Sequence, residues 1–146
     1  MIQTHAVQIA RPARAVFDFL ADPAMLGLWS MGTFRAVPAA DGLIDGRSIQ
    51  TGGRVCVRIR PSVEKLLIDY LVGPDPDSLS PRIWARVIPG DVLGHGPDAS
   101  LFCLFALRAS DGDATRWALL AHLHEVEIDL VRAHLETGYD HRRDGP

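Results

Sequence analysis

A long run without glycine or proline, residues 114–137, ends a chain that otherwise contains mostly short apolar segments and turns. Its apolar side chains follow helical spacing in two neighbouring strips. The first strip contains Trp117, Leu120, Ala121, His124, Ile128, Val131 and Leu135, and the second contains Leu119, Leu123, Val126 and Leu130. The pattern predicts one long helix that is buried over a wide arc, with other elements on its flank.

The segments before this helix favour strands. A first strand is predicted over 4–9, and six more over 33–37, 43–50, 54–60, 66–72, 81–88 and from Ser100 onward. Short turns between neighbours imply antiparallel pairing. The apolar face of such a sheet has to be covered, and only the final helix is long enough to cover it. We therefore predict an α+β fold in which a curved, seven-stranded antiparallel sheet wraps around the helix and leaves a space beneath it.

The stretch RPARAVFDFLADPAMLGLWS, residues 11–30, interrupts the strands. Pro12 suits the first position of a short helix, whose residues Val16, Phe19 and Leu20 share one face. Asp22 and Pro23 are a typical helix start for a second short helix that ends near Trp29. We predict an elbow that closes one end of the sheet. Trp29 then lies either at the rim of the interior space or within the packed joint.

Both signals occur together in one known group of proteins. The opening RPARAVFDFLADPAMLGLW and the terminal helix ATRWALLAHLHEVEIDLVRAHLE resemble the START/SRPBCC superfamily, which includes polyketide cyclase/dehydrase-like and lipid-transport-like proteins. The resemblance implies a helix-grip fold over residues 1–138, followed by a flexible tail over 139–146. It also implies an internal cavity that holds a small hydrophobic or aromatic molecule.

His124 is the strongest candidate for chemistry, because it lies in the middle of an apolar helix face near Trp117, which we also predict to contact the ligand. A histidine there can bind a ligand or act as acid or base, and it can equally be a core residue satisfied by its neighbours. Glu127 is within reach as an i, i+3 neighbour and either orients His124, pairs with an arginine or faces solvent. HEVE lacks the second histidine of a zinc helix, so we predict no metal.

The strands supply the other candidates. Asp69 and Tyr70 are adjacent, so only one of them can face the interior, and we favour Tyr70 as a polar handle in the cavity. The arginines of 54–60 and 81–88 suit a solvated outer face, or else one of them, Arg58 or Arg86, faces inward to bind an anionic group. Trp84 shares its side with Arg86 and either stacks there or forms a subunit contact.

Composition excludes several function classes. A net charge of −3 argues against a nucleic-acid partner. No apolar run is long enough for a membrane span, there is no secretory h-region, and no phosphate-loop or dinucleotide motif implies a cofactor. Two cysteines are too few for a disulfide framework. Lys65 is the only lysine among many arginines, a bias typical of GC-rich bacterial genes, so we predict a bacterial, cytoplasmic protein.

Three functions remain open. The first is binding of a small hydrophobic or aromatic molecule through Trp29, Tyr70 and His124 in an apolar cavity. The second is a polyketide cyclase/dehydratase-type enzyme that uses His124 as its acid/base. The third is a non-catalytic interaction protein with a filled core. The run SLFCLFAL is apolar on both faces, which leaves a homodimer open. A cavity of several hundred Å³ that His124 reaches would separate the first two from the third.

Overall fold

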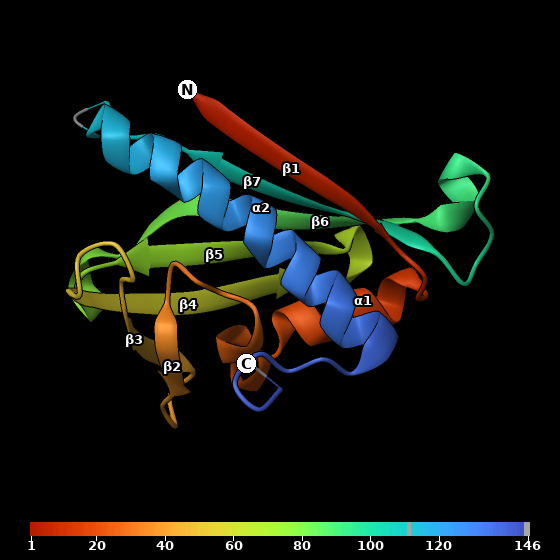
Figure 1. Ribbon diagram of the computed structural model, residues 1–146, viewed down its shortest axis with the longest axis horizontal. Coiled ribbons are helices and arrows are strands. Elements are labelled where there is room, and N and C mark those ends of the chain that lie inside the picture. Colours follow the sequence, from red (N-terminus) through yellow and green to blue (C-terminus); the bar gives the residue numbers. More distant parts are fainter. Residues whose placement is uncertain (111, 145–146) are drawn as a thin grey trace.

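The computed structural model describes residues 1–110 and 112–144. The elements follow the predicted order, from the first strand through the helical elbow and six strands to the long helix (Figure 1). The strands are β1 (Ile2–Ile9), β2 (Phe34–Pro38), β3 (Leu43–Arg47), β4 (Arg54–Ser62), β5 (Leu67–Gly73), β6 (Ser80–Pro89) and β7 (Ser100–Leu107). The helices are α1 (Ala13–Ala21), η1 (Pro23–Leu28) and α2 (Ala114–Thr137), with three further 3₁₀ turns, η2 (Val63–Lys65), η3 (Pro76–Ser78) and η4 (Gly90–Leu93).

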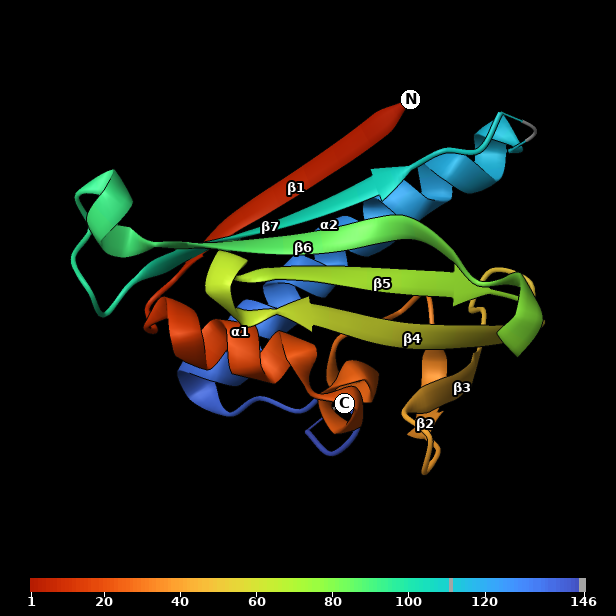
Figure 2. The same ribbon diagram turned by 180° about the vertical axis from the view of Figure 1, so that it is seen from behind.

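All seven strands form one antiparallel sheet in the order β1-β7-β6-β5-β4-β3-β2. Only the β1–β7 pair joins strands that are distant in the chain, because the elbow residues carry the chain across the sheet between β1 and β2 (Figures 1 and 2). The predicted α+β helix-grip architecture is therefore confirmed.

Helix α2 crosses one face of the sheet (Figure 1), and its bounds match the predicted 114–137. Its start is capped by Asp113, whose side chain accepts a hydrogen bond from the Arg116 backbone N–H at 2.8 Å. Its end is set by Gly138, which has a φ of 75° and donates its N–H to the His134 carbonyl at 2.8 Å. Of the described residues, no helix is long and apolar enough to cross a membrane.

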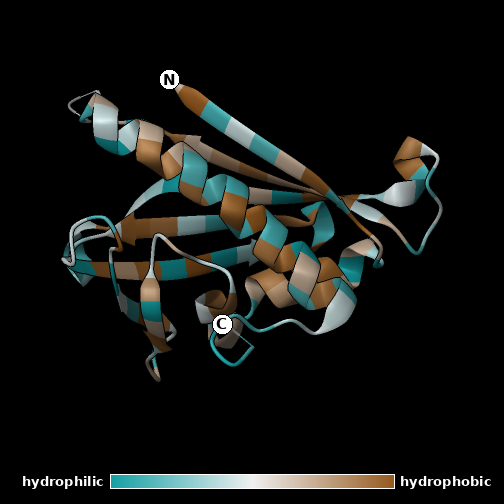
Figure 3. Ribbon diagram, in the orientation of Figure 1, coloured by the Kyte–Doolittle hydropathy of each residue, from teal (hydrophilic) through white to brown (hydrophobic). Residues whose placement is uncertain are grey.

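The burial of α2 differs from the predicted wide arc. Its buried residues are His124, Glu127, Ile128 and Val131. Two members of the second apolar strip, Leu119 and Val126, remain 45% and 50% exposed. The outward turns of α2 accordingly include hydrophobic residues (Figure 3). The prediction was wrong because, in the described part of the chain, α2 packs mainly on β1, β7 and η1, and these contacts leave the strip of Leu119 and Val126 about half exposed.

The elbow forms as its sequence indicates. α1 buries Val16, Phe19 and Leu20, and the Asp22 side chain caps η1 by accepting from the Ala24 N–H at 2.9 Å. Pro12 occupies the N-cap position of α1, one residue earlier than predicted. The elbow is tied to the sheet because the Tyr70 hydroxyl on β5 donates to the Leu20 carbonyl at 2.9 Å.

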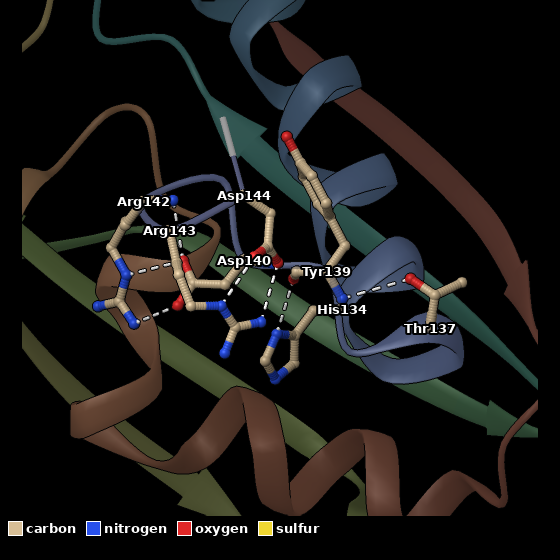
Figure 4. A network of polar contacts seen from close by, with 7 residues as sticks. All are labelled: His134, Thr137, Tyr139, Asp140, Arg142, Arg143 and Asp144. Carbon is tan, nitrogen blue, oxygen red and sulfur yellow. Dashed lines mark hydrogen bonds and ion pairs between the residues drawn. The ribbon is translucent and has the colours of Figure 1, made fainter. Parts of the chain in front are cut away.

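The chain after α2 folds back beside the elbow (Figure 4). Asp140 pairs with Arg142 at 3.0 Å, and Arg143 pairs with Asp144 at 2.7 Å. The pKa of Asp144 is lowered to about 2 by its hydrogen bond from Arg143. These contacts lie in the segment that the sequence predicted as a tail over 139–146, of which residues 145 and 146 lie outside the described residues.

Candidate functional site

A cavity of about 300 Å³ lies between α2 and the inner face of the sheet. Its walls come from β4, β5, β6, β7, the N-terminal two-thirds of α2 and the loop that follows η1. Apolar side chains make most of the wall on the sheet side, namely Val55, Val57, Val72, Ile83, Leu104 and Ala106. The strict alternation of RVCVRIR accounts for part of this wall, because Val55 and Val57 project from the same face of β4.

Trp29 and Tyr70 line the cavity where the elbow meets β5. Their rings meet edge to face with centroids 5.8 Å apart, a favoured aromatic geometry. Trp29 is only 3% exposed, and its indole Nε1 has no hydrogen-bond partner among the described residues. The Tyr70 hydroxyl already donates to the Leu20 carbonyl, so its proton is not free for a ligand.

Glu127 is a buried carboxyl group in the cavity wall, 3% exposed. Its Oε1 accepts hydrogen bonds from the backbone N–H groups of Met31 at 2.6 Å and Gly32 at 2.8 Å. Burial raises its pKa from 4.5 to about 7, although these amides and the Ser30 side chain favour the charged form. Glu127 therefore joins α2 to the loop after Trp29 through a group that titrates near neutral pH.

His124 lies one turn before Glu127 and is 2% exposed. Its Nε2 is 3.7 Å from the Glu127 Oε2, too long for a hydrogen bond and within ion-pair range. Burial, with a smaller contribution from His5, lowers the pKa of His124 to about 4, so the ring is neutral at physiological pH. Its Nδ1 has no partner among the described residues and belongs to a side chain that lines the cavity.

Five of the eight predicted site residues thus meet in one place: Trp29, Tyr70, Trp117, His124 and Glu127 line the same cavity. The other three, Arg58, Trp84 and Arg86, lie elsewhere. Arg58 donates to the Asp41 carbonyl at 3.1 Å, and Trp84 stacks on Phe105 with centroids 5.2 Å apart. The register explains this, because Trp84 and Arg86 alternate with Ala85, which is fully buried on the inner face.

Three arginines that sequence reasoning did not select also line the cavity: Arg82, Arg108 and Arg116. Alternation along β6 would place Arg82 on the outer face with Trp84. The β5–β6 register shifts between Tyr70 and Leu71, which pair with Ile83 and Pro81, so Arg82 is the extra residue of a β-bulge. A bulge re-aims its side chain, and Pro81 beside it was the only signal in the sequence that the ladder could break there.

The described residues contain no group of three His, Cys, Asp or Glu side chains that could hold a metal ion. The arrangement instead offers an apolar surface, an indole N–H, a neutral imidazole and a carboxyl group that exchanges a proton near pH 7. These groups can bind an oxygen-bearing apolar molecule or transfer a proton to or from it.

No model of a known protein family matches the chain, and no curated protein matches it either. Solved structures do match it. A START superfamily protein from Mycobacterium smegmatis is 12% identical, with a TM-score of 0.66 over 94% of this chain and 99% of that one. The Aha1 dimer from Colwellia psychrerythraea is 14% identical, with a TM-score of 0.68 over 94% and 98%.

A di-domain ARO/CYC protein, BexL of the BE-7585A biosynthetic pathway, is 15% identical with a TM-score of 0.67. The match covers 93% of this chain and 46% of BexL, so this chain corresponds to about half of that protein. At such identities these likenesses concern the fold alone. The START/SRPBCC-like fold that the sequence predicted is confirmed by them.

Proposed function

We propose that this protein binds a small hydrophobic or aromatic molecule in the cavity beneath α2. The observation that carries the proposal is a space of about 300 Å³ whose largely apolar wall includes three buried side chains with polar groups, Trp29, His124 and Glu127. Ligand sites are typically apolar clefts of this size or larger with a few fixed polar groups.

The energetics of the wall support binding. A buried polar atom without a partner costs about 1–3 kcal/mol, and both Trp29 Nε1 and His124 Nδ1 lack one among the described residues. A ligand that contacts the valines of β4 removes apolar surface from water. Because Trp29 Nε1 and His124 Nδ1 are fully buried, such a ligand offsets their cost only if these side chains turn toward it. The same cavity argues against the third function, an interaction protein with a filled core.

Native mass spectrometry of the purified protein tests the proposal by looking for a co-purified small molecule. Titration with 2-naphthol, followed by its fluorescence, then tests the cavity directly. Leu120→Trp should fill the space and abolish binding, because Leu120 lines the cavity. Leu119→Trp is the matched control, since the neighbouring Leu119 is 45% exposed and should leave binding unchanged. Equal binding by both variants would contradict the proposal.

Catalysis of the cyclase/dehydratase type is a second candidate, favoured by one observation. His124 Nε2 and Glu127 Oε2 lie 3.7 Å apart in a buried site, and their pKa values of about 4 and 7 allow a neutral base beside a protonated acid. The ARO/CYC proteins BexL and StfQ share the fold. An enolisable poly-β-ketone is the substrate class to test.

In that reading, His124→Ala should weaken ligand binding by no more than the roughly 2- to 10-fold of one hydrogen bond and lower turnover by at least about 10²-fold. His122→Ala, on the exposed side of the same helix, should retain full activity. A wild-type protein that binds the substrate with no measurable turnover would leave ligand binding as the function.

The proposal keeps two further features predicted from the sequence, a bacterial cytoplasmic location and a homodimer. The stacked pair Trp84 and Phe105 forms an apolar feature on the outer face of the sheet, which supports a subunit contact there. Sedimentation velocity of the wild type and of Phe105→Ser tests this. A dimer that Phe105→Ser dissociates is expected, and a wild type that stays monomeric at all concentrations would contradict it.

A further inference from the structure

Among the polar side chains of the cavity wall, which also include Ser30, Thr33, Ser48, Gln50, Tyr70 and Asp113, two sets differ in their chemistry. Trp29, His124 and Glu127 form an inner set, and the arginines Arg82, Arg108 and Arg116 form an outer set. Arg116 lies eight residues before His124 on α2, which corresponds to about 12 Å along the helix axis. The cavity is therefore polarised along the direction of α2.

The inner set selects an uncharged oxygen. The indole Nε1–H of Trp29 is a donor only, so its complement is an acceptor such as a hydroxyl or carbonyl oxygen. The carboxyl group of Glu127 is buried and already engaged by two backbone amides. A second negative charge beside it would be desolvated and repelled, so a carboxylate is disfavoured at this end.

The outer set selects negative charge. Arg82 precedes Ile83, whose register partner is Ala106, and Arg108 follows Ala106 by two residues, so both cations lie at the same end of the β6–β7 pair. Arg108 donates to the Gly112 carbonyl at 3.2 and 2.7 Å and is held in place. Asp113 also lines this end, where its side chain accepts from the Arg116 N–H as the cap of α2.

We infer that the ligand enters in one orientation: an aromatic body with an uncharged hydroxyl or carbonyl oxygen at the Trp29–His124 end and an anionic group at the Arg82–Arg116 end. This inference rests on the proposed binding function and narrows its ligand class to aromatic or polycyclic acids that also carry a hydroxyl or ketone. Purely aliphatic molecules and simple aromatic acids match only part of the site.

Four probes share one naphthalene ring system and differ only in whether they carry a hydroxyl group, a carboxylate, both or neither. They are 6-hydroxy-2-naphthoic acid, 2-naphthol, 2-naphthoic acid and naphthalene. The hydroxy acid should bind the wild type most tightly. Removing its hydroxyl should weaken binding roughly 2- to 10-fold, the range of one net hydrogen bond. Removing its carboxylate should weaken binding by up to about 5-fold at low salt, because an arginine contact at an exposed mouth is worth little more.

Variants test whether the hydroxyl group binds at the Trp29 end of the cavity and the carboxylate at the arginine end. Trp29→Phe should weaken 2-naphthol and leave 2-naphthoic acid unchanged. Arg82→Gln and Arg116→Gln should weaken the two acids and leave 2-naphthol unchanged. Arg60→Gln is the matched control, because Arg60 is exposed, pairs across from Asp69 and is not a cavity residue. The indole N–H resonance of Trp29 should shift with 2-naphthol and stay in place with naphthalene.

The outcomes distinguish this inference from the proposed function. If all four probes bind with equal affinity, the polarity is wrong and the binding function stands. The same holds if the arginine variants weaken 2-naphthol as much as the acids. If no probe binds and native mass spectrometry finds no co-purified molecule, the binding function itself fails. The probe comparison in the wild type does not depend on any variant, so it decides the question even if Trp29→Phe is unstable.

Discussion

The two parts of α2 differ in burial although they belong to one uninterrupted helix. All four buried residues of α2 lie in the second half, from His124 onward, and none of the described residues 114–123 is buried. The second half is fixed to α1 and to the residues before it, since the Glu136 carboxylate accepts from the Ala10 N–H at 2.7 Å and His134 stacks on Phe19 near the end of α1. The first half lacks such packing and covers the cavity together with His124 and Glu127.

The difference shows how a small domain leaves space in its interior. The cavity residues Trp117 and Leu120 are only half-buried because they face the cavity and not a packed core. The first half is held at its far end, where the Gln3 side chain donates to the Trp117 carbonyl at 3.2 Å. The packing of the second half and the hydrogen bond from Gln3 to Trp117 therefore hold the first half above the sheet.

The largest expected effect is on stability: truncating a side chain in the second half of α2 should lower the free energy of unfolding more than truncating one in the first half. Ile128→Ala, in the packed half, should lower the free energy of unfolding by roughly 2–5 kcal/mol. Leu120→Ala removes a side chain that already borders the cavity, so less than about 1 kcal/mol is expected. Urea denaturation measures both. Equal losses would show that the first half is packed as tightly as the second.

A second effect concerns the boundary between the halves and depends on pH. The pKa of Glu127 rises on folding from 4.5 to about 7, so the folded state binds the proton more tightly than the unfolded state. The free energy of unfolding should therefore fall by up to about 3 kcal/mol as the pH rises from 4.5 to 7. The pKa of His124 falls from 6.5 to about 4, so its contribution is opposite: stability is lost as pH falls through 6.5 toward 4.

The two slopes oppose each other in the wild type, and single variants should separate them. Glu127→Gln should leave a protein whose stability rises from pH 4 to 6.5, and His124→Gln one whose stability falls from pH 4.5 to 7. Thermal unfolding across this range measures the slopes, with the exposed His122→Gln as the control. Slopes of the same sign in the two variants would contradict the opposite pKa shifts of Glu127 and His124.

The smallest effect belongs to the outward strip of α2. Leu119→Glu and Val126→Glu should each change stability by no more than about 0.5 kcal/mol, because both side chains are about half exposed. Light scattering on the same samples gives their mass. A large loss of stability, or dissociation of a wild-type oligomer, would show that this strip is covered by a second subunit.

Local signals predicted most of the fold. The bounds of α2 follow from a run without breakers between Asp113 and Gly138, and the elbow follows from Asp22 and Pro23, because caps and breakers act within a few residues. The cavity residues Trp29, Tyr70 and His124 could be selected because each is a polar or aromatic group in an apolar pattern. Their actual role in binding stays a prediction.

The rest depends on contacts that no local pattern encodes. The alternation of a strand defines two faces but does not show which face is inner, so Trp84 and Arg86 were predicted in the site although they face outward. Arg82 was missed because it lies in a bulge, which alternation does not predict. The two amides bound by Glu127 are 96 and 95 residues away in the sequence. The exposure of Leu119 depends on an absent neighbour among the described residues, which helical spacing cannot reveal.

The bonds from Met31 and Gly32 to Glu127 have a consequence for how the cavity can be observed. A change in the charge of this carboxyl group alters the strength of both amide hydrogen bonds. The ¹⁵N–¹H resonances of Met31 and Gly32 should therefore titrate together with a midpoint near the Glu127 pKa of about 7. Two backbone signals then report the proton occupancy of the interior, and any ligand that displaces that proton will move them without an added dye.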